Sequence, residues 1–391
     1  MVRNLHRVGC IIRACRHTPA RLSYPQEMRA TKRKSQVGSG GEGERALLAQ
    51  IRSRAGQSSQ GRLRLGIGDD CALLRPRAGE ELAVTTDLSI SGRHFRLGWH
   101  PPESVGHRTL ARGLSDLAAM GARPVAAFLS LGLPSELTRS TRGRKSKSKS
   151  WPNSWPNSWI ARFLDGLLSL AEAHATPLAG GDLSESPLAM ADIVLIGAVP
   201  RGKALLRSGA HPGDLLYVTG SLGGSACGLA RLAELASAAG LTECESDRKR
   251  SLKIPAKAEA ELAPHLYPQP RIAQGRWLVR HSAATAALDL SDGLSTDLAH
   301  LCEESHVAAE VDAGALPIHP GATLAQALHG GEDYELLFTA APSTRLPKSI
   351  AGVPLTKIGH IVRPRSNRPQ IALHTANGSQ ALEPQGWEHF S

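Results

Sequence analysis

The chain has 391 residues, of which 41% are hydrophobic and 21% are charged, which is enough for two domains that each bury a core. The formal net charge of +11 comes from two short segments. Residues 1–37 and 139–150 hold fifteen of the 46 Lys and Arg residues but only one of the 35 acids. The rest of the chain is slightly acidic, so a nucleic-acid-binding face, which needs cations spread over a folded surface, is not predicted.

The six cysteines form no C-x-x-C pair and show no histidine spacing of the kind that binds zinc. This pattern argues against a zinc finger and against a disulfide framework, and it predicts a reducing, cytoplasmic location. No run of the sequence approaches the roughly 18 apolar residues that a membrane span requires, so no membrane partner is predicted.

Two segments are predicted to lie outside the folded body. Residues 1–40 are expected to form a basic, disordered tail, with a transit peptide or a later start at Met28 as alternatives. Residues 139–158 contain a Ser/Lys run and a tandem WPNS repeat, which cannot continue a helix and therefore indicate an inserted, solvent-exposed loop. A basic RNA-associated protein that uses these two segments is the alternative function from a different class.

Apolar periodicity begins near Ala46 and predicts mixed strands and helices. In the first half the expected elements are strand 81–90, helix 103–122, strand 124–134, helix 159–175 and strand 191–200. In the second half they are strand 214–220, helix 224–238, helix 270–281, strand 286–291, helix 294–304, strand 307–312, helix 322–329 and strand 334–340. These two blocks predict an α/β (α+β) protein with domains 41–200 and 201–391.

Two glycine-containing stretches suggest phosphate binding. The segment GAVPRGK, residues 197–203, is close to the P-loop pattern, but Pro200 lacks an N–H and Ala204 cannot ligate a metal, so the segment is interpreted as an inter-domain connector. The stretch VTGSLGGSACGLA, residues 218–230, runs from a strand through glycines into a helix. It is either an anion site at the helix N-terminus or a tight turn packed with small residues.

Several aspartates stand beside glycines or on apolar elements, where an unpaired carboxylate is costly. They are Asp69, Asp70, Asp87, Asp116, Asp182, Asp289 and Asp292. Any one of them alone is explained as a helix cap or a turn residue. Together, and without a Cys/His cluster, they predict a site for several Mg²⁺ ions at phosphate groups, because Mg²⁺ prefers carboxylate oxygens. Asp297 is instead expected to be a surface acid on the solvent side of its helix.

Seven motifs in order carry a family resemblance. They are GIGDDCALL, TTD with His94 seven residues after its Asp, LSDLAAMGAR, LAGGD, LLRSGAHPGDLLYVTG, ALDLSDGLSTDL and HGGEDYELLF. They resemble the motifs of thiamine-monophosphate kinases, a family of the aminoimidazole-ribonucleotide-synthetase-like superfamily. The resemblance extends from about residue 41 to the closing GWEHF and leaves out residues 139–158.

The resemblance implies a two-domain fold with mixed sheets packed by helices, a homodimer formed through the N-terminal domain, and Mg²⁺-assisted in-line transfer of phosphate from ATP to thiamine monophosphate. This reaction is the last step of thiamine diphosphate biosynthesis. The implied metal ligands are Asp70, Thr85, Thr86, Asp87, Asp116, Asp182, Asp289 and Asp292. The implied ATP contacts are Gly181, Asp182, Arg207 and Ser291, and the implied contacts with thiamine monophosphate are His94, Glu332 and Trp387.

This chemistry agrees with the residue pattern. The nucleophile is a phosphate oxygen with a second pKa near 6, so it is ionised at neutral pH and no general base is required. The sequence accordingly shows no Ser-His-Asp or Cys-His arrangement. Metal ions held by aspartates would neutralise the two anions and align them.

One departure from the family pattern concerns the helix that carries Asp116. Where the family reads A-V-N-L-S-D, this chain reads A-R-G-L-S-D, so Gly113 replaces Asn and lowers helix propensity by roughly 1 kcal/mol relative to Ala. The nearest alternative function is a sister ATP enzyme, such as an aminoimidazole-ribonucleotide or selenophosphate synthetase. The latter would need a reactive Cys in a glycine-rich N-terminal loop, whereas Cys71 follows the metal motif inside an apolar run.

Overall fold

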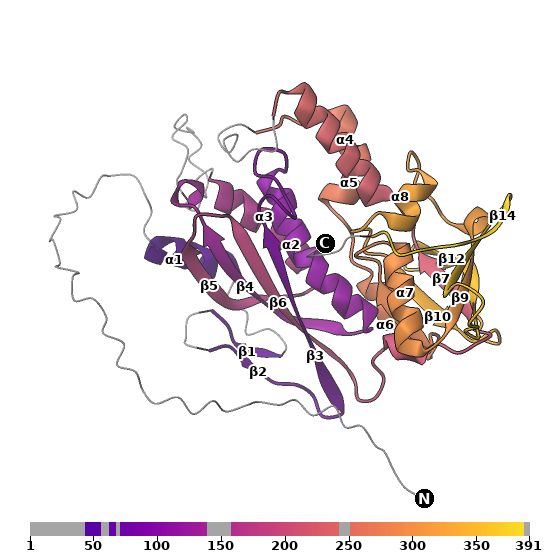
Figure 1. Ribbon diagram of the computed structural model, residues 1–391. Helices are drawn as coiled ribbons and strands as arrows, with labels where there is room; N and C mark the ends of the chain where they lie inside the picture. The colour runs from indigo at the N-terminus through magenta and orange to yellow at the C-terminus, as the bar shows by residue number, and fades with distance from the viewer. Residues whose placement is uncertain (1–43, 56–61, 68–70, 139–157, 242–250, 387–391) are drawn as a thin grey trace, which may run out of the picture. The chain divides into compact units, whose positions relative to one another are not determined.

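The computed structural model describes residues 44–55, 62–67, 71–138, 158–241 and 251–386 (Figure 1). The predicted tail and almost all of the predicted insertion lie outside these ranges, as do Asp69, Asp70 and Trp387. The described residues belong to one unit, which begins at Gly40. No helix in the described ranges is long and apolar enough to cross a membrane.

A four-stranded sheet forms the first half of the fold, with strand order β3-β6-β4-β5. Its strands are β3 (Glu80–Ile90), β4 (Arg123–Leu133), β5 (Leu178–Glu185) and β6 (Met190–Pro200). They are preceded by α1 (Glu44–Ala55) and the short pair β1 (Leu63–Leu65) and β2 (Leu73–Leu74), and η1 (Ser135–Thr138) follows β4. The β6 strand is antiparallel to both neighbours, whereas β4 and β5 are parallel, as a helical crossover between them requires.

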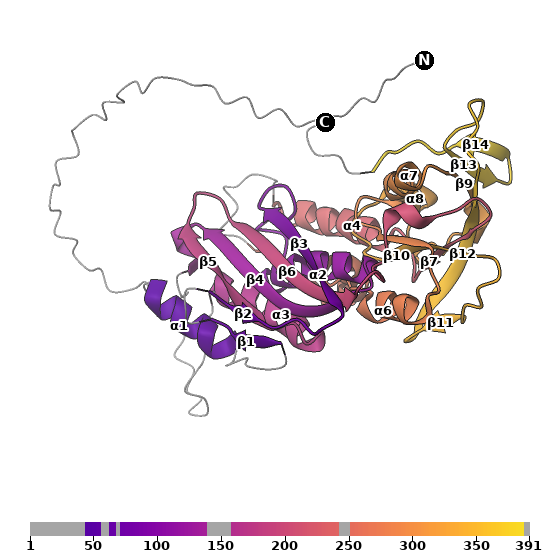
Figure 2. The ribbon, with the colours of Figure 1, turned by 90° about the horizontal axis from the view of Figure 1, so that it is seen from below.

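Two helices, α2 (Pro102–Ala119) and α3 (Trp159–Ala173), cover one face of this sheet (Figures 1 and 2). The helices approach each other closely at a glycine on each. A Cβ atom on Gly106 would lie 1.8 Å from the carbonyl oxygen of Phe163, and one on Gly166 would lie 1.9 Å from that of Glu103. Any larger residue at either position would push the helices apart, so these two glycines set the position of α2.

The second sheet has eight strands in the order β14-β13-β9-β12-β7-β10-β8, with β11 paired to β12. Its strands are β7 (Leu215–Thr219), β8 (Ala286–Asp289), β9 (Ala308–Asp312), β10 (Leu336–Ala340), β11 (Ser349–Ile350), β12 (Val353–Val362), β13 (Ile371–Thr375) and β14 (Gly378–Ala381). All pairs are antiparallel except β9 with β13.

Helices pack on both faces of the second sheet. One face is covered by α7 (Leu294–Ser305) and α8 (Leu324–His329). On the other face, Phe338 and its neighbours share a core with α2 and with α6 (Ile272–His281). Helix α2 therefore contacts both sheets. The remaining helices are α4 (Gly224–Ala238) and α5 (Glu259–Leu266), which pack against each other, and the short turns are η2 (Arg207–Gly209), η4 (Ala256–Ala258) and η5 (Ala313–Ala315).

The predicted fold class is confirmed, because mixed sheets are packed by helices in both halves. Each predicted strand and helix is present within a few residues, and α4 has the predicted bounds. The prediction omitted α1, β1, β2, β5, α5 and the last four strands.

Candidate functional site

Four of the predicted metal-binding aspartates line one cavity of about 360 Å³. Asp87 lies near the end of β3 and Asp116 lies on α2. Asp289 is the last residue of β8, and Asp292 lies in the turn that leads into α7. Both sheets thus contribute carboxylates, and α2 holds the two sets together because it contacts both.

These aspartates carry more negative charge than the described residues neutralise. Asp116 accepts a hydrogen bond from the Thr85 hydroxyl, and Asp289 accepts one from the Ser115 hydroxyl at 2.6 Å. Burial, together with the neighbouring carboxylates, nevertheless raises the pKa values of Asp87 and Asp116 to about 6. Burial also raises the pKa of Asp289. Such a site stabilises a cation that enters it.

The donor set fits Mg²⁺ bound together with substrate. Within the described ranges, no group of three or more His, Cys, Asp or Glu side chains is placed to hold a metal ion. Mg²⁺ commonly binds one or two carboxylates and takes its other ligands from water and from substrate phosphates. Pairs of aspartates around a cavity therefore suit metal ions that arrive with a nucleotide.

Arg112 is a charged residue of the cavity that the sequence analysis did not single out. It lies on α2, one turn before Asp116, and its guanidinium is 3.4 Å from the Asp87 carboxylate. The neighbouring Gly113 allows close packing on β6, because a Cβ atom there would lie 2.6 Å from Cδ1 of Leu195. The sequence signal for Arg112 was its departure from the family pattern, because this chain reads A-R-G-L-S-D where the family reads A-V-N-L-S-D.

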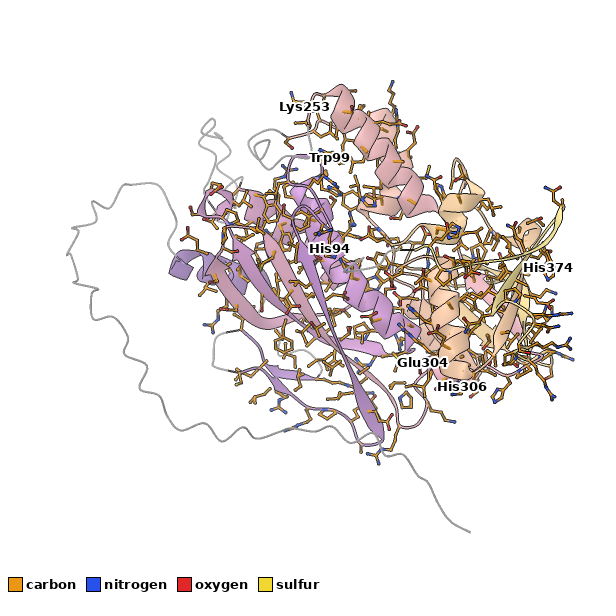
Figure 3. All side chains as sticks on the ribbon, viewed as in Figure 1. His94, Trp99, Lys253, Glu304, His306 and His374 are labelled. Atoms are coloured by element: carbon orange, nitrogen blue, oxygen red, sulfur yellow. The ribbon has the colours of Figure 1, made fainter. Side chains whose placement is uncertain are left out.

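The predicted substrate contacts His94 and Glu332 line the same cavity. His94, labelled in Figure 3, lies beside α2, and its Nδ1 accepts a hydrogen bond from the Ile90 amide at 3.0 Å. Glu332 accepts a hydrogen bond from Arg108 at 2.5 Å. Burial favours the neutral acid, but the charges of Arg108 and Arg112 outweigh it and hold the pKa of Glu332 below its usual value.

Other predicted site residues lie elsewhere. Thr86 points to the opposite face of β3 from Thr85 and donates to Asp192 at 3.1 Å. Gly181 and Asp182 are exposed on β5 and do not line the cavity.

Ser291 lines the cavity, and Arg207 is exposed on η2. Burial raises the pKa values of Asp116 and Asp289, and the charge of Arg207 offsets part of that increase. Asp70 and Trp387 are outside the described residues.

The prediction for Asp297 is wrong. This residue is 3% exposed, and its carboxylate accepts hydrogen bonds from the amides of Asp292 and Gly293, both at 3.0 Å. It therefore holds the turn that carries Asp292. Burial and the charges of Asp289 and Asp292 raise its pKa to about 8.

The glycine-containing loop before α4 forms a turn whose backbone amides bind the carboxylate of Asp333. Asp333 accepts hydrogen bonds from the amides of Gly223 and Ser225, at 2.6 and 3.0 Å. The amides that the sequence suggested for an anion are thus used by a residue of the chain itself. Burial raises the pKa of Asp333 to about 7.

Comparisons with known proteins agree with this architecture. Models of the AIR synthase related protein family match residues 68–200 with the N-terminal domain and residues 211–370 with the C-terminal domain. The thiamine-monophosphate kinase of Escherichia coli K12 is 36% identical over 361 residues, which cover 89% of this chain and 98% of that protein.

Two solved structures are similar along most of their length. The thiamine-monophosphate kinase of Stenotrophomonas maltophilia K279a is 38% identical with a TM-score of 0.66, covering 85% of this chain and 96% of that one. AaThiL, in its complex with AMPPCP and TMP, is 28% identical with a TM-score of 0.62, covering 89% of this chain and 97% of that one.

Proposed function

The chain belongs to the thiamine-monophosphate kinases of the AIR synthase related family, and from this premise we propose that it transfers the γ-phosphoryl group of ATP to thiamine monophosphate, giving thiamine diphosphate and ADP. The observation that carries the proposal is the cavity in which four aspartates from both halves of the chain meet the predicted substrate contacts His94 and Glu332. The solved structure of the related protein AaThiL is a complex with AMPPCP and TMP, which supports both substrates.

The residues of the cavity divide into two groups. Asp87, Asp116, Asp289 and Asp292 would hold Mg²⁺, which supplies positive charge to the transferring phosphoryl group and to both anions. The positive charge of Arg207, which does not line the cavity, acts on Asp289 and favours its ionised form. His94 and Glu332 would fix the acceptor substrate.

No described residue has to remove a proton from the nucleophile, because the attacking phosphate oxygen is already ionised at neutral pH. The protein's contribution is alignment and charge. The protein would hold the γ-phosphate of ATP and the phosphate of thiamine monophosphate in line. The charges of the buried aspartates and of Arg112 would set the electrostatic potential around them.

A homodimer is part of the proposal. Leu82, Val84 and Leu88 are exposed on the face of β3 that points away from α2, and β3 is an edge strand of its sheet. A second copy of the chain that covers this apolar strand would bury these side chains.

We also propose domains 41–200 and 201–391, supported by the two family models. A cytoplasmic location is supported by the unpaired cysteines Cys71, Cys227 and Cys302 among the described residues.

The test is an assay with ATP, Mg²⁺ and thiamine monophosphate, with ADP and thiamine diphosphate separated by chromatography. We expect product from the monophosphate and none from thiamine. Asp289→Asn should lower turnover by roughly 100-fold or more, since it removes a buried charge from the proposed metal site. Asp165→Asn, on the outer side of α3, is the matched control and should retain activity. A folded wild-type protein without product would overturn the proposal.

A further inference from the structure

Four buried side chains form a hydrogen-bonded chain beside Glu332. Arg108 NH1 lies 2.8 Å from His265 Nε2, and His100 Nε2 lies 3.2 Å from the same nitrogen. The other nitrogen of His265, Nδ1, lies 3.0 Å from the Ser225 hydroxyl. None of the four residues is more than 5% exposed. The network joins α2 to α4 and α5.

The geometry fixes the protons of both imidazoles. The guanidinium of an arginine can only donate hydrogen bonds. His265 Nε2 must therefore accept with its lone pair, and the proton of this neutral ring is on Nδ1. His100 must then present an N–H at Nε2, because two lone pairs at 3.2 Å would repel. His100 Nδ1 lies 3.1 Å from the Arg96 amide nitrogen, from which it accepts in this tautomer, and 3.3 Å from the Arg96 carbonyl oxygen, which is the longer of the two contacts. Burial, with the Arg108 charge, holds the pKa values of both histidines well below the usual value, so both rings are neutral.

The orientation of the Ser225 hydroxyl follows from these assignments. His265 Nδ1–H donates to Ser225 Oγ, so the Ser225 oxygen is the acceptor in this hydrogen bond. The hydrogen of the Ser225 hydroxyl is not used in it and can be donated to another group. In the part of the chain that the structure describes, this hydroxyl has no second partner. Ser225 lines the cavity together with Ala226 and Leu229, so a ligand in the cavity can accept this hydrogen.

We propose that Ser225 is a specificity-determining residue that donates a hydrogen bond to a ring nitrogen of the acceptor substrate, and that His265, His100 and Arg108 are positioning residues that hold it in this role. Ser225 lies on the Glu332 side of the cavity, because His265 Nδ1 is 3.0 Å from its hydroxyl and 3.8 Å from the Glu332 carboxylate.

An aminopyrimidine has an edge on which an amino group lies next to a ring nitrogen. The Ser225 hydroxyl can donate to such a ring nitrogen, and the Glu332 carboxylate can accept from such an amino group. The inference rests on the proposed function, because thiamine monophosphate supplies that edge.

The first test needs no ligand. Long-range ¹H–¹⁵N spectra of the histidine rings in the wild-type protein should show the proton on Nε2 of His100 and on Nδ1 of His265. A charged His265, or one with its proton on Nε2, would overturn the assignment of Ser225 as a free donor.

The second test measures binding of thiamine monophosphate by calorimetry without ATP. Ser225→Ala should weaken binding about tenfold, the size of one hydrogen bond to a buried acceptor, and leave the KM for ATP and the saturated kcat almost unchanged. Ser225→Cys fills the same volume with a weak donor and should bind as poorly as the alanine variant. Ser237→Ala, on an exposed position of the same helix, is the control.

An analogue separates recognition from packing. The analogue is a thiamine monophosphate in which the ring nitrogen beside the amino group is replaced by C–H. It should bind the wild-type protein about tenfold more weakly than thiamine monophosphate does. The Ser225→Ala variant should bind the analogue and thiamine monophosphate equally well. Full recovery in Ser225→Cys, or equal losses for the analogue in both proteins, would overturn the proposal. Wild-type protein that neither binds nor phosphorylates thiamine monophosphate would instead refute the proposed function.

Discussion

Arg112 on α2 lies 3.4 Å from the Asp87 carboxylate on β3 and places a fixed positive charge among the buried aspartates of the cavity. Both side chains are partly shielded, with exposed fractions of 17% and 23%. The pKa of Asp87 is raised to about 6 by burial even with Arg112 beside it. In the metal-free protein Arg112 therefore offsets part of the repulsion among the aspartates of the cavity. It is paired with the Asp87 carboxylate, which the proposed metal ion would also bind.

Replacing this arginine should destabilise the metal-free protein and strengthen metal binding. For Arg112→Met we expect the free energy of unfolding at pH 7 to fall by about 1–3 kcal/mol, less than for a fully buried ion pair because both groups are partly exposed. Urea titration measures this loss. Mg²⁺ should raise the stability of the variant more than that of the wild type, since the metal then replaces the lost cation. Arg112→Lys is the control, and equal Mg²⁺ responses in Met and wild-type proteins would contradict the prediction.

The raised aspartate pKa values predict the pH dependence of stability. Burial raises the pKa values of Asp87 and Asp116 to about 6 in the folded protein, above the usual value of 3.8 for an aspartate. The folded state thus binds more protons than the unfolded state between these values, and stability is lost as the pH rises from about 4 to about 6. Denaturant unfolding of the metal-free protein at several pH values should show this slope. Asp116→Asn should reduce it, and saturating Mg²⁺ should remove most of it because the metal stabilises the ionised carboxylates.

The sequence was informative where local pattern determines structure. Apolar periodicity located α4 at residues 224–238, and the search for aspartates beside glycines or on apolar elements located Asp87, Asp116, Asp289 and Asp292. It could not indicate pairs that only the folded chain brings together. Arg108 and Glu332 are 224 residues apart, and His100 and His265 are 165 apart. Nothing in either local segment identifies the partner.

One error was avoidable. Asp297 follows Leu294 by three residues and precedes Leu301 by four, so it lies on the apolar stripe of α7 rather than on its solvent side. A carboxylate on a buried helical face needs donors, and the amides of the preceding turn are the nearest ones. Helical periodicity applied to the acid itself, and not only to its apolar neighbours, would have placed it correctly.

Asp297 should tolerate loss of its charge but not loss of its acceptor. Its pKa of about 8 means that it is mostly protonated at pH 7. Asp297→Asn keeps an oxygen for the amides of Asp292 and Gly293 and has no acid to ionise when the chain unfolds. Its unfolding free energy should therefore be close to that of the wild type near pH 4, exceed it increasingly as the pH rises to about 8, and keep a constant lead above that pH. Asp297→Ala should be about 1–3 kcal/mol less stable than Asp297→Asn at every pH, because two buried amides lose their acceptor. Thermal or urea unfolding across this pH range distinguishes the variants, and equal losses for Asn and Ala would show that the charge itself matters.

The apolar face of β3 should be the contact between two copies of the chain. Val84 is 63% exposed and lies between Leu82 and Leu88, each 45% exposed, on an edge strand. Burying a valine contributes about 1.5–3 kcal/mol, so Val84→Lys should weaken self-association by at least roughly tenfold. Sedimentation equilibrium should show a dimer for the wild type and a shift toward monomer for the variant. Leu206→Lys is the matched control, since Leu206 is 52% exposed and lies outside the strand. A wild-type monomer at micromolar concentration, or a Val84→Lys dimer as tight as the wild type, would mean that this strand is not the dimer contact.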